Sequence, residues 1–372
     1  MQKWTSTLSI EDNSDWNNNQ ILQDIFTQDA IFFDIETTGF SPVSSQLYII
    51  GCARRKNSNI IIDQYFAETK EEEQNLLISF LTLLEEYQTI ITFNGLGFDI
   101  PYIKAKCTQY QVIEHFSEKK YIDLFKIVSS LKFLLKLPNY KQKTIEDFLG
   151  IQRNDTFDGG ELIHIYQEYR NHPCENQLFF LKQHNYEDVL GMLDLLPLLS
   201  YSDFLKGGYT ISSIESNLYT DYDGLSQKEL IFSLGIEKPL PKRISVNYED
   251  CYLVASGTEA KLKVRIFEGE LKFFFDNYKN YYYLPAEDTA IHKDIASFVA
   301  KDHRKKATAS TCYTKKESLF LPQYQVIVTP AFYKQYKDKT SYFELSDDFI
   351  SSDLTLRQYL NHILVQMSSQ KN

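Results

Sequence analysis

The sequence contains few cysteines, and none of them lies in a pattern that marks a metal site. Its 372 residues include five cysteines, which are Cys52, Cys107, Cys174, Cys251 and Cys312. No two of them have the CxxC spacing of a zinc site, and a disulfide framework is typical of much shorter secreted chains. We therefore expect reduced thiols in an intracellular protein.

Long apolar runs and an excess of positive charge are also absent. No apolar stretch approaches the ~20 residues that cross a bilayer. Residues 1–28 are polar and acidic and lack the pattern of a signal peptide. We expect them to be a lead-in of low structural content in a soluble, cytoplasmic protein with no membrane partner. The net charge of -11 argues against broad attraction to nucleic acid, although a local basic groove is compatible with it.

One apolar stretch, Ile31 to Gly39, contains two carboxylates and organises the rest of the chain. Successive side chains of a strand point to opposite faces. Asp34 and Glu36 therefore share one face, while Phe33 and Ile35 point into the opposite layer. Two neighbouring carboxylates repel each other and resist burial, and a hard divalent cation relieves both effects. This strand is predicted to form the floor of a metal site.

The segments after this strand alternate between strand and helix patterns. Two β-rich runs follow at 47–53 and 59–66, then a helix at 70–87 with one apolar face and a strand at 89–93. Further helices are expected at 123–136, 144–149, 158–170 and 177–198. This order predicts an α/β domain over residues 29–204, in which helices cover both faces of a mixed five-stranded sheet.

The composition shifts to Ser, Tyr, Asp and Gly at 201–224, where we place a domain boundary. The following residues, 205–372, predict a smaller α+β domain. We expect strands at 251–254, 261–267, 270–275 and 325–328, with a hairpin turn at Gly269, and helices at 287–301 and 355–367.

Three later residues can complete the metal site. Asp99 follows a strand end, and Asn94 and Gly95 precede it in a loop through which a substrate backbone could approach closely. His184 and Asp188 are four residues apart on a predicted helix and therefore share a face. A metal ligand beside an imidazole suits a hydrolase.

These residues form three motifs in order: Asp34-x-Glu36, Asn94-Gly95-x-x-Phe98-Asp99 and His184-Asn185-x-x-Asp188. They resemble the motifs of the DEDD 3′–5′ exonucleases, which have an RNase H-like fold, and are most similar to the YprB-type RNase H-like domain. The segments between the motifs are also similar to that domain at 121–124, 143–153 and 158–161. The resemblance covers residues 29 to 200.

The resemblance implies a two-metal nuclease that uses Mg²⁺ or Mn²⁺ and acts on nucleic acid with a single-stranded 3′ end, without a nucleotide cofactor. Asp34 would bridge the two ions, Glu36 and Asp188 would hold one, and Asp99 would act on the other. His184 would accept a proton from the attacking water. It lies four residues before Asp188, the spacing of the tyrosine branch of these enzymes but with a histidine side chain.

Other residues are expected to support this site. Asn94, Gly95 and Phe98 are candidate substrate contacts, and Asp123 either caps a helix or orients a ligand or the end of helix 177–198. In the second region, Lys305 and Lys306 belong to a basic stretch close in sequence to several tyrosines, which predicts a surface for single-stranded nucleic acid. A solvated helix end and packed tyrosines would explain the same pattern.

Three functions are compatible with these residues. A 3′–5′ exonuclease on DNA or RNA agrees best with the motifs. A structure-specific endonuclease could use the same fold, and a non-catalytic scaffold would bind nucleic acid without cutting it.

Overall fold

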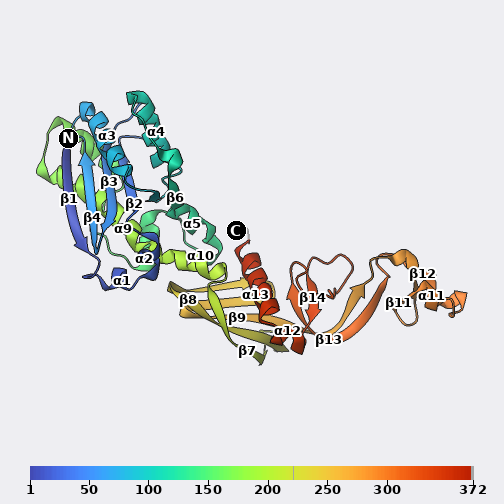
Figure 1. Cartoon of the computed structure of the whole chain (residues 1–372). Coiled ribbons are helices and arrows are strands. Elements are labelled where there is room, and N and C mark those ends of the chain that lie inside the picture. Colours follow the sequence, from blue (N-terminus) through green and yellow to red (C-terminus); the bar gives the residue numbers. More distant parts are fainter. Residues whose placement is uncertain (221, 370–372) are drawn as a thin grey trace. The chain divides into compact units, whose positions relative to one another are not determined.

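The computed structural model describes residues 1–220 and 222–369 (Figure 1). The chain divides into two compact units. The first comprises Met1–Ser202 together with Leu240–Lys242, and the second comprises Asp203–Pro239 and the described residues from Arg243 onward. Among the described residues, no helix is long and apolar enough to span a membrane.

The first unit is built on a mixed six-stranded sheet in the order β1-β4-β3-β2-β5-β6. Its four strands from β1 to β2 pair antiparallel, and β2, β5 and β6 pair parallel. The strands are β1 (Gln2–Ser9), β2 (Ala30–Thr37), β3 (Leu47–Lys56), β4 (Asn59–Phe66), β5 (Thr89–Thr92) and β6 (Lys120–Asp123).

Helices cover both faces of this sheet, as the sequence predicted. On one face, Phe33 and Ile35 of β2 pack in a core with apolar residues of α3 and α4. On the other face, Tyr48 and Phe66 pack against α8 and α9. The helices of this unit are α1 (Ser14–Asn17), α2 (Gln20–Ile25), α3 (Glu73–Leu84), α4 (Asp99–Tyr110), α5 (Leu124–Ser130), α6 (Lys132–Leu135), α7 (Gln142–Leu149), α8 (Gly159–Asn171) and α9 (Glu175–Asp194). The next helix, α10 (Leu199–Leu205), begins in this unit and ends in the second.

The expectation that residues 1–28 have little structure is wrong. They form β1, α1 and α2, and β1 pairs with β4 along its whole length, so the sheet has one strand more than expected. β1 is mostly polar, and its side chains are exposed or half-buried. Such a sequence can still form an edge strand, because the backbone hydrogen bonds to the neighbouring strand hold it in place. Trp16 of α1 is buried, and its indole Nε1 donates to Asp194 Oδ1 at 2.6 Å.

The second unit is mainly β-structure. A five-stranded sheet has the order β14-β13-β9-β8-β7, and a separate three-stranded sheet has the order β11-β10-β12. The elements are β7 (Tyr209–Thr220), β8 (Ser226–Tyr248), β9 (Cys251–Phe274), β10 (Tyr281–Leu284), β11 (Thr289–His292), α11 (Lys293–Ala296), β12 (Lys305–Lys306), β13 (Tyr313–Gln323), β14 (Ser341–Glu344), α12 (Asp347–Ser351) and α13 (Asp353–Ser368).

Three expectations for this unit are wrong, whereas the C-terminal helix is present as α13. Gly269 is not a hairpin turn, because β13 pairs with β9 on both sides of it and the strand continues through the glycine at a φ of 146°. Most of 287–301 is not helical, since residues 289–292 pair with β10 as β11. Residues 325–328 are a loop, because the Gln323 side chain accepts the backbone N–H groups of Ile327 and Val328.

Candidate metal and catalytic centre

Two carboxylates of β2 form the floor of the site. Ile31, Phe33 and Ile35 are buried against α3 and α4. The intervening Asp34 and Glu36 are half-buried on the other face, toward α9. The alternation of the strand therefore anchors its apolar residues in one core and presents both acids to a different layer.

Asp99 is brought to β2 by the end of the neighbouring parallel strand. It is the first residue of α4, it is buried, and its Oδ1 accepts the backbone N–H of Ile35 at 3.2 Å. The hydrogen bond places its carboxylate next to the strand segment that holds Asp34 and Glu36. Asp99 thus joins these acids although it lies far from them in the sequence.

Helix α9 supplies the remaining side chains from the opposite layer. His184 Nε2 lies 3.6 Å from Glu36 Oε1 and 3.1 Å from Asp188 Oδ2. Glu36, His184 and Asp188 can each offer a ligand atom within 4.8 Å of the others, an arrangement able to hold a metal ion. Asn185, which is fully buried, donates from Nδ2 to Asp34 Oδ2 at 3.2 Å.

The acids are electrostatically strained in the absence of a cation. Burial, followed by the charges of Asp99 and Glu36, raises the pKa of Asp34 well above its ordinary value. Burial also raises the pKa of Glu36 to about 7. Burial and the charges of nearby acids raise the pKa of Asp99 to about 7. Oxygen-rich donors that resist ionisation together are suited to Mg²⁺ or Mn²⁺, because a hard divalent cation neutralises them. The residues present therefore fit the expected metal.

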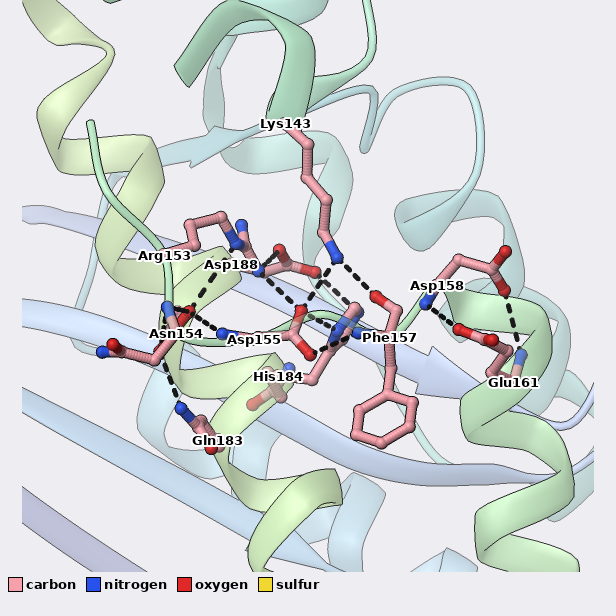
Figure 2. A network of polar contacts seen from close by, with 12 residues as sticks. Lys143, Arg153, Asn154, Asp155, Phe157, Asp158, Glu161, Gln183, His184 and Asp188 are labelled. Carbon is pink, nitrogen blue, oxygen red and sulfur yellow. Dashed lines mark hydrogen bonds and ion pairs between the residues drawn. The ribbon is translucent and has the colours of Figure 1, made fainter. Parts of the chain in front are cut away.

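A second layer of charged residues surrounds His184 and Asp188 (Figure 2). Asp155 Oδ2 contacts His184 Nδ1 at 2.7 Å and also binds Lys143 Nζ at 2.9 Å. Burial alone would lower the pKa of His184, but the hydrogen bonds to Asp155 and Asp188 outweigh it and raise this pKa to about 11. Nε2 is directed at Glu36 and Asp188, and the negative charge of these acids favours a proton on the imidazole.

Arg153 connects this layer to the candidate metal ligand Asp188. Its Nη2 lies 2.6 Å from Asp188 Oδ1, and its Nη1 donates to the buried Glu146 at 3.0 Å. Burial would raise the pKa of Asp188, but His184 and Arg153 keep it below its ordinary value. The pKa of Asp188 is thus shifted in the opposite direction from those of Asp34, Glu36 and Asp99.

No role for Asp155, Arg153 or Asn185 was predicted from the sequence. Asp155 and Arg153 lie in the segment between α7 and α8, and Asp155 is 29 residues from His184 in the chain. No local periodicity marks such a contact. For Asn185 a signal existed, because it adjoins His184 in the third motif and a side-chain amide can donate a hydrogen bond to a carboxylate.

Asp123 orients a loop and not helix 177–198. Its side chain caps α5, and its two oxygens accept the backbone N–H groups of Asn94 at 2.9 Å and Leu96 at 3.1 Å. Asn94 adopts a φ of 63°, and a Cβ at Gly95 would lie 2.5 Å from the Thr92 Cβ. The glycine and the Asp123 carboxylate together hold the loop that leads into Asp99.

Of the other candidate substrate contacts, Phe98 lies at the start of α4. Its ring is 6.0 Å from that of Phe40, which is 90% exposed. Lys305 and Lys306 form β12 in the second unit and are exposed. Their binding role stays a prediction.

Comparison with known proteins agrees with this geometry. Residues 31–200 match the family model of the RNase H superfamily. No curated protein matches the sequence significantly.

Three similar solved structures show partial overlap. The family B DNA polymerase of Pyrobaculum calidifontis is 14% identical with a TM-score of 0.38, and the match covers 47% of this chain and 24% of the polymerase chain. E. coli exonuclease I in complex with a dT13 oligonucleotide is 12% identical with a TM-score of 0.34, and the match covers 55% of this chain and 54% of the exonuclease chain. The EXO domain of Aedes aegypti Nibbler is 12% identical with a TM-score of 0.30, and the match covers 49% of this chain and 84% of the Nibbler domain.

The chain thus spans about a quarter of the polymerase and about half of exonuclease I. The match of residues 31–200 to the RNase H superfamily model and the mixed sheet with helices on both faces agree with the predicted fold.

Proposed function

We propose that the first unit is a metal-dependent nuclease that hydrolyses phosphodiester bonds of DNA or RNA. The observation that carries the proposal is the convergence of Asp34, Glu36, Asp99 and Asp188, which three separated segments bring together around β2. Three of these acids have raised pKa values, so the protein maintains an arrangement that is unfavourable unless cations bind.

The four acids would hold two Mg²⁺ or Mn²⁺ ions. Bound ions of this kind activate a water molecule and neutralise charge that develops on the phosphate. Asn185 fixes the orientation of Asp34, and the Ile35 backbone fixes Asp99. The chain therefore prepares the ligand oxygens before the substrate arrives, which reduces the cost of reorganisation during the reaction.

His184 is the proposed general base at Nε2. The negative charges of Glu36 and Asp188 raise the pKa of His184 and favour its protonated form. Cations bound to these acids would neutralise their charge and lower the pKa of His184, so that its imidazole could accept a proton. Asp155 remains bound at Nδ1 and stabilises the imidazolium that forms when His184 takes a proton. Arg153 and Asp155 are positioning residues in this scheme.

A 3′–5′ exonuclease of the YprB-type DEDD class is the specific activity that we propose, because the three motifs resemble that class. Asn94 is exposed and would contact the nucleic-acid backbone, whereas the buried Gly95 packs against Thr92 and shapes the loop. Phe40 is exposed and lies edge-on to the half-buried Phe98, so an unpaired base could stack on the Phe40 ring.

The test uses an end-labelled single strand with Mg²⁺ or Mn²⁺ and compares the wild type with Asp34→Asn. We expect a ladder that shortens from the 3′ end with the wild type and no cleavage with the variant. Asp12→Asn, at an exposed carboxylate, is the matched control and should cleave normally. Internal cuts would indicate an endonuclease, binding without cleavage a scaffold, and full activity of Asp34→Asn would overturn the assigned site.

A further inference from the structure

The second unit carries a small module that the nuclease proposal does not use. We call residues 281–307 the tip module; they contain β10, β11, α11 and β12 and are drawn in orange in Figure 1, where β11, α11 and β12 carry labels. In β10, Tyr282 pairs with Lys306 of β12 and with Ile291 of β11, so these side chains share one face of the sheet. The module presents apolar and basic side chains together.

The tyrosines that the sequence analysis associated with base stacking are mostly engaged in holding this module together. Tyr281 stacks on Phe275 with ring centroids 4.6 Å apart. The hydroxyls of Tyr283 and Tyr313 both donate to Asp288. These rings are structural, and a nucleic-acid base would need another partner.

Phe298 is such a partner, and no pattern in the sequence singled it out. Its side chain is 91% exposed, and Ile295 nearby is 62% exposed. The preceding helix α11 is held in place by Arg304, which donates to the Ala296 carbonyl and lies with its guanidinium carbon 4.9 Å from the Tyr282 ring centroid. A large apolar ring is thus held in solvent on an anchored segment.

The residues next to Phe298 in the sequence are rich in positive charge, although the whole chain has a net charge of -11. Residues 293–306 contain five cations and two carboxylates. The carboxylates of Asp294 and Asp302 lie 3.1 Å and 3.6 Å from the nearest ring nitrogens of His292 and His303. The basic side chains are Lys293, Lys301, Arg304, Lys305 and Lys306, and the four lysines are exposed.

We propose that the tip module binds single-stranded nucleic acid, with the lysines on the phosphates and Phe298 under an unpaired base. The choice of this polyanion rests on the proposed nuclease function. Lysine neutralises backbone phosphates, and an aromatic ring can stack on a base only when the base is unpaired. α11 has four residues, too few for an amphipathic helix that lies in a lipid interface.

The test measures binding of a short fluorescein-labelled oligothymidylate to the full-length Asp34→Asn protein by fluorescence anisotropy. Lys305→Glu/Lys306→Glu should raise Kd about 10-fold and reduce the slope of log Kd against log salt by roughly 2. Phe298→Ala should raise Kd about 5-fold or more with an unchanged salt slope, because stacking releases no counterions. Lys261→Glu/Lys339→Glu, at exposed lysines elsewhere in the unit, is the charge-matched control and should bind like the parent.

The proposal is overturned if the tip variants bind with the Kd and salt slope of the parent. The proposal is also overturned if the tip variants lose binding to vesicles containing phosphatidylserine but still bind the oligonucleotide like the parent. The two proposals fail separately. A wild-type protein that binds through the tip without cutting contradicts only the nuclease proposal, whereas one that cuts while the tip variants bind normally contradicts only this inference.

Discussion

The amide of Asn185 occupies the space beside Gly51, where a Cβ would lie 2.1 Å from Asn185 Oδ1. Gly51 is in β3 and pairs with Asp34 of β2. From this position Asn185 donates to Asp34 and accepts from Gln64 Nε2 at 3.1 Å. The missing side chain of one strand thus makes room for the group that orients a candidate ligand on the next.

Gly51→Ala should therefore damage both the fold and the site. The added methyl group would displace Asn185 or Val189, and overpacking of this kind costs about 1–3 kcal/mol of unfolding free energy. We expect lower stability in urea and a lower cleavage rate. Gly159→Ala is the control, because nothing lies within 4 Å of a Cβ there. Equal stability and activity in the two variants would contradict the role of Gly51.

The metal requirement should depend on pH. Folding raises the pKa of Glu36 from 4.5 to about 7 and that of Asp99 from 3.8 to about 7. Protonation of these two acids therefore stabilises the fold fully at acid pH, and this stabilisation is lost as the pH rises through about 7. Cations compete with these protons. The increase in Tm on adding Mn²⁺ should be larger at about pH 8 than at about pH 6, by roughly 5 °C.

The matched variant for this measurement is Asp34→Asn/Glu36→Gln, whose Tm should respond little to Mn²⁺ at either pH. A wild-type Tm that is insensitive to Mn²⁺ across this range would argue against a cation site at these acids.

Asp155→Asn should change the titration of His184 and the rate together. Removal of the carboxylate charge should lower the pKa of His184 below about 11 in the metal-free protein, because Asp155 is one of the groups that raise it. The loss of an outer partner of this kind typically costs about 10- to 100-fold in activity or metal affinity.

The His184 pKa is measured by NMR titration of the imidazole, with His184→Gln to assign its resonances. Asp147→Asn, at an exposed carboxylate, should change neither quantity. An unaltered His184 titration in Asp155→Asn would show that the contact does not control the imidazole.

Asp123→Ala should loosen the loop before Asp99. It leaves the backbone N–H groups of Asn94 and Leu96 without their acceptor, which costs about 1–3 kcal/mol for each group that stays buried. We expect KM for an oligonucleotide to rise more than kcat falls. Asp123→Asn keeps one acceptor oxygen and should lie between Asp123→Ala and the wild type; steady-state kinetics of the three proteins would check this order.

Local patterns were enough to predict much of the first unit. The alternation around Asp34 placed its neighbours Phe33 and Ile35 in one core, and the four-residue spacing of His184 and Asp188 placed both on one face of α9. Such features depend on periodicity within one element, which a sequence displays directly.

Contacts that join distant segments could not be predicted in the same way. Asp155 meets His184 only because the segment after α7 returns to α9, and Gly269 continues a strand because β13 pairs across it. In each case tertiary pairing overrides the local signal, since glycine indicates a turn when read alone.

The pairing of β1 with β4 has a practical consequence for work with shorter versions of this protein. All eight residues of β1 are matched to β4, from Gln2 opposite Phe66 to Ser9 opposite Asn59. Removal of residues 1–28 would leave the N–H and C=O groups along this border of the sheet open to any extended chain. A trimmed protein of this kind should self-associate through β4, and an apparent loss of nuclease activity would then report aggregation and not a missing catalytic group.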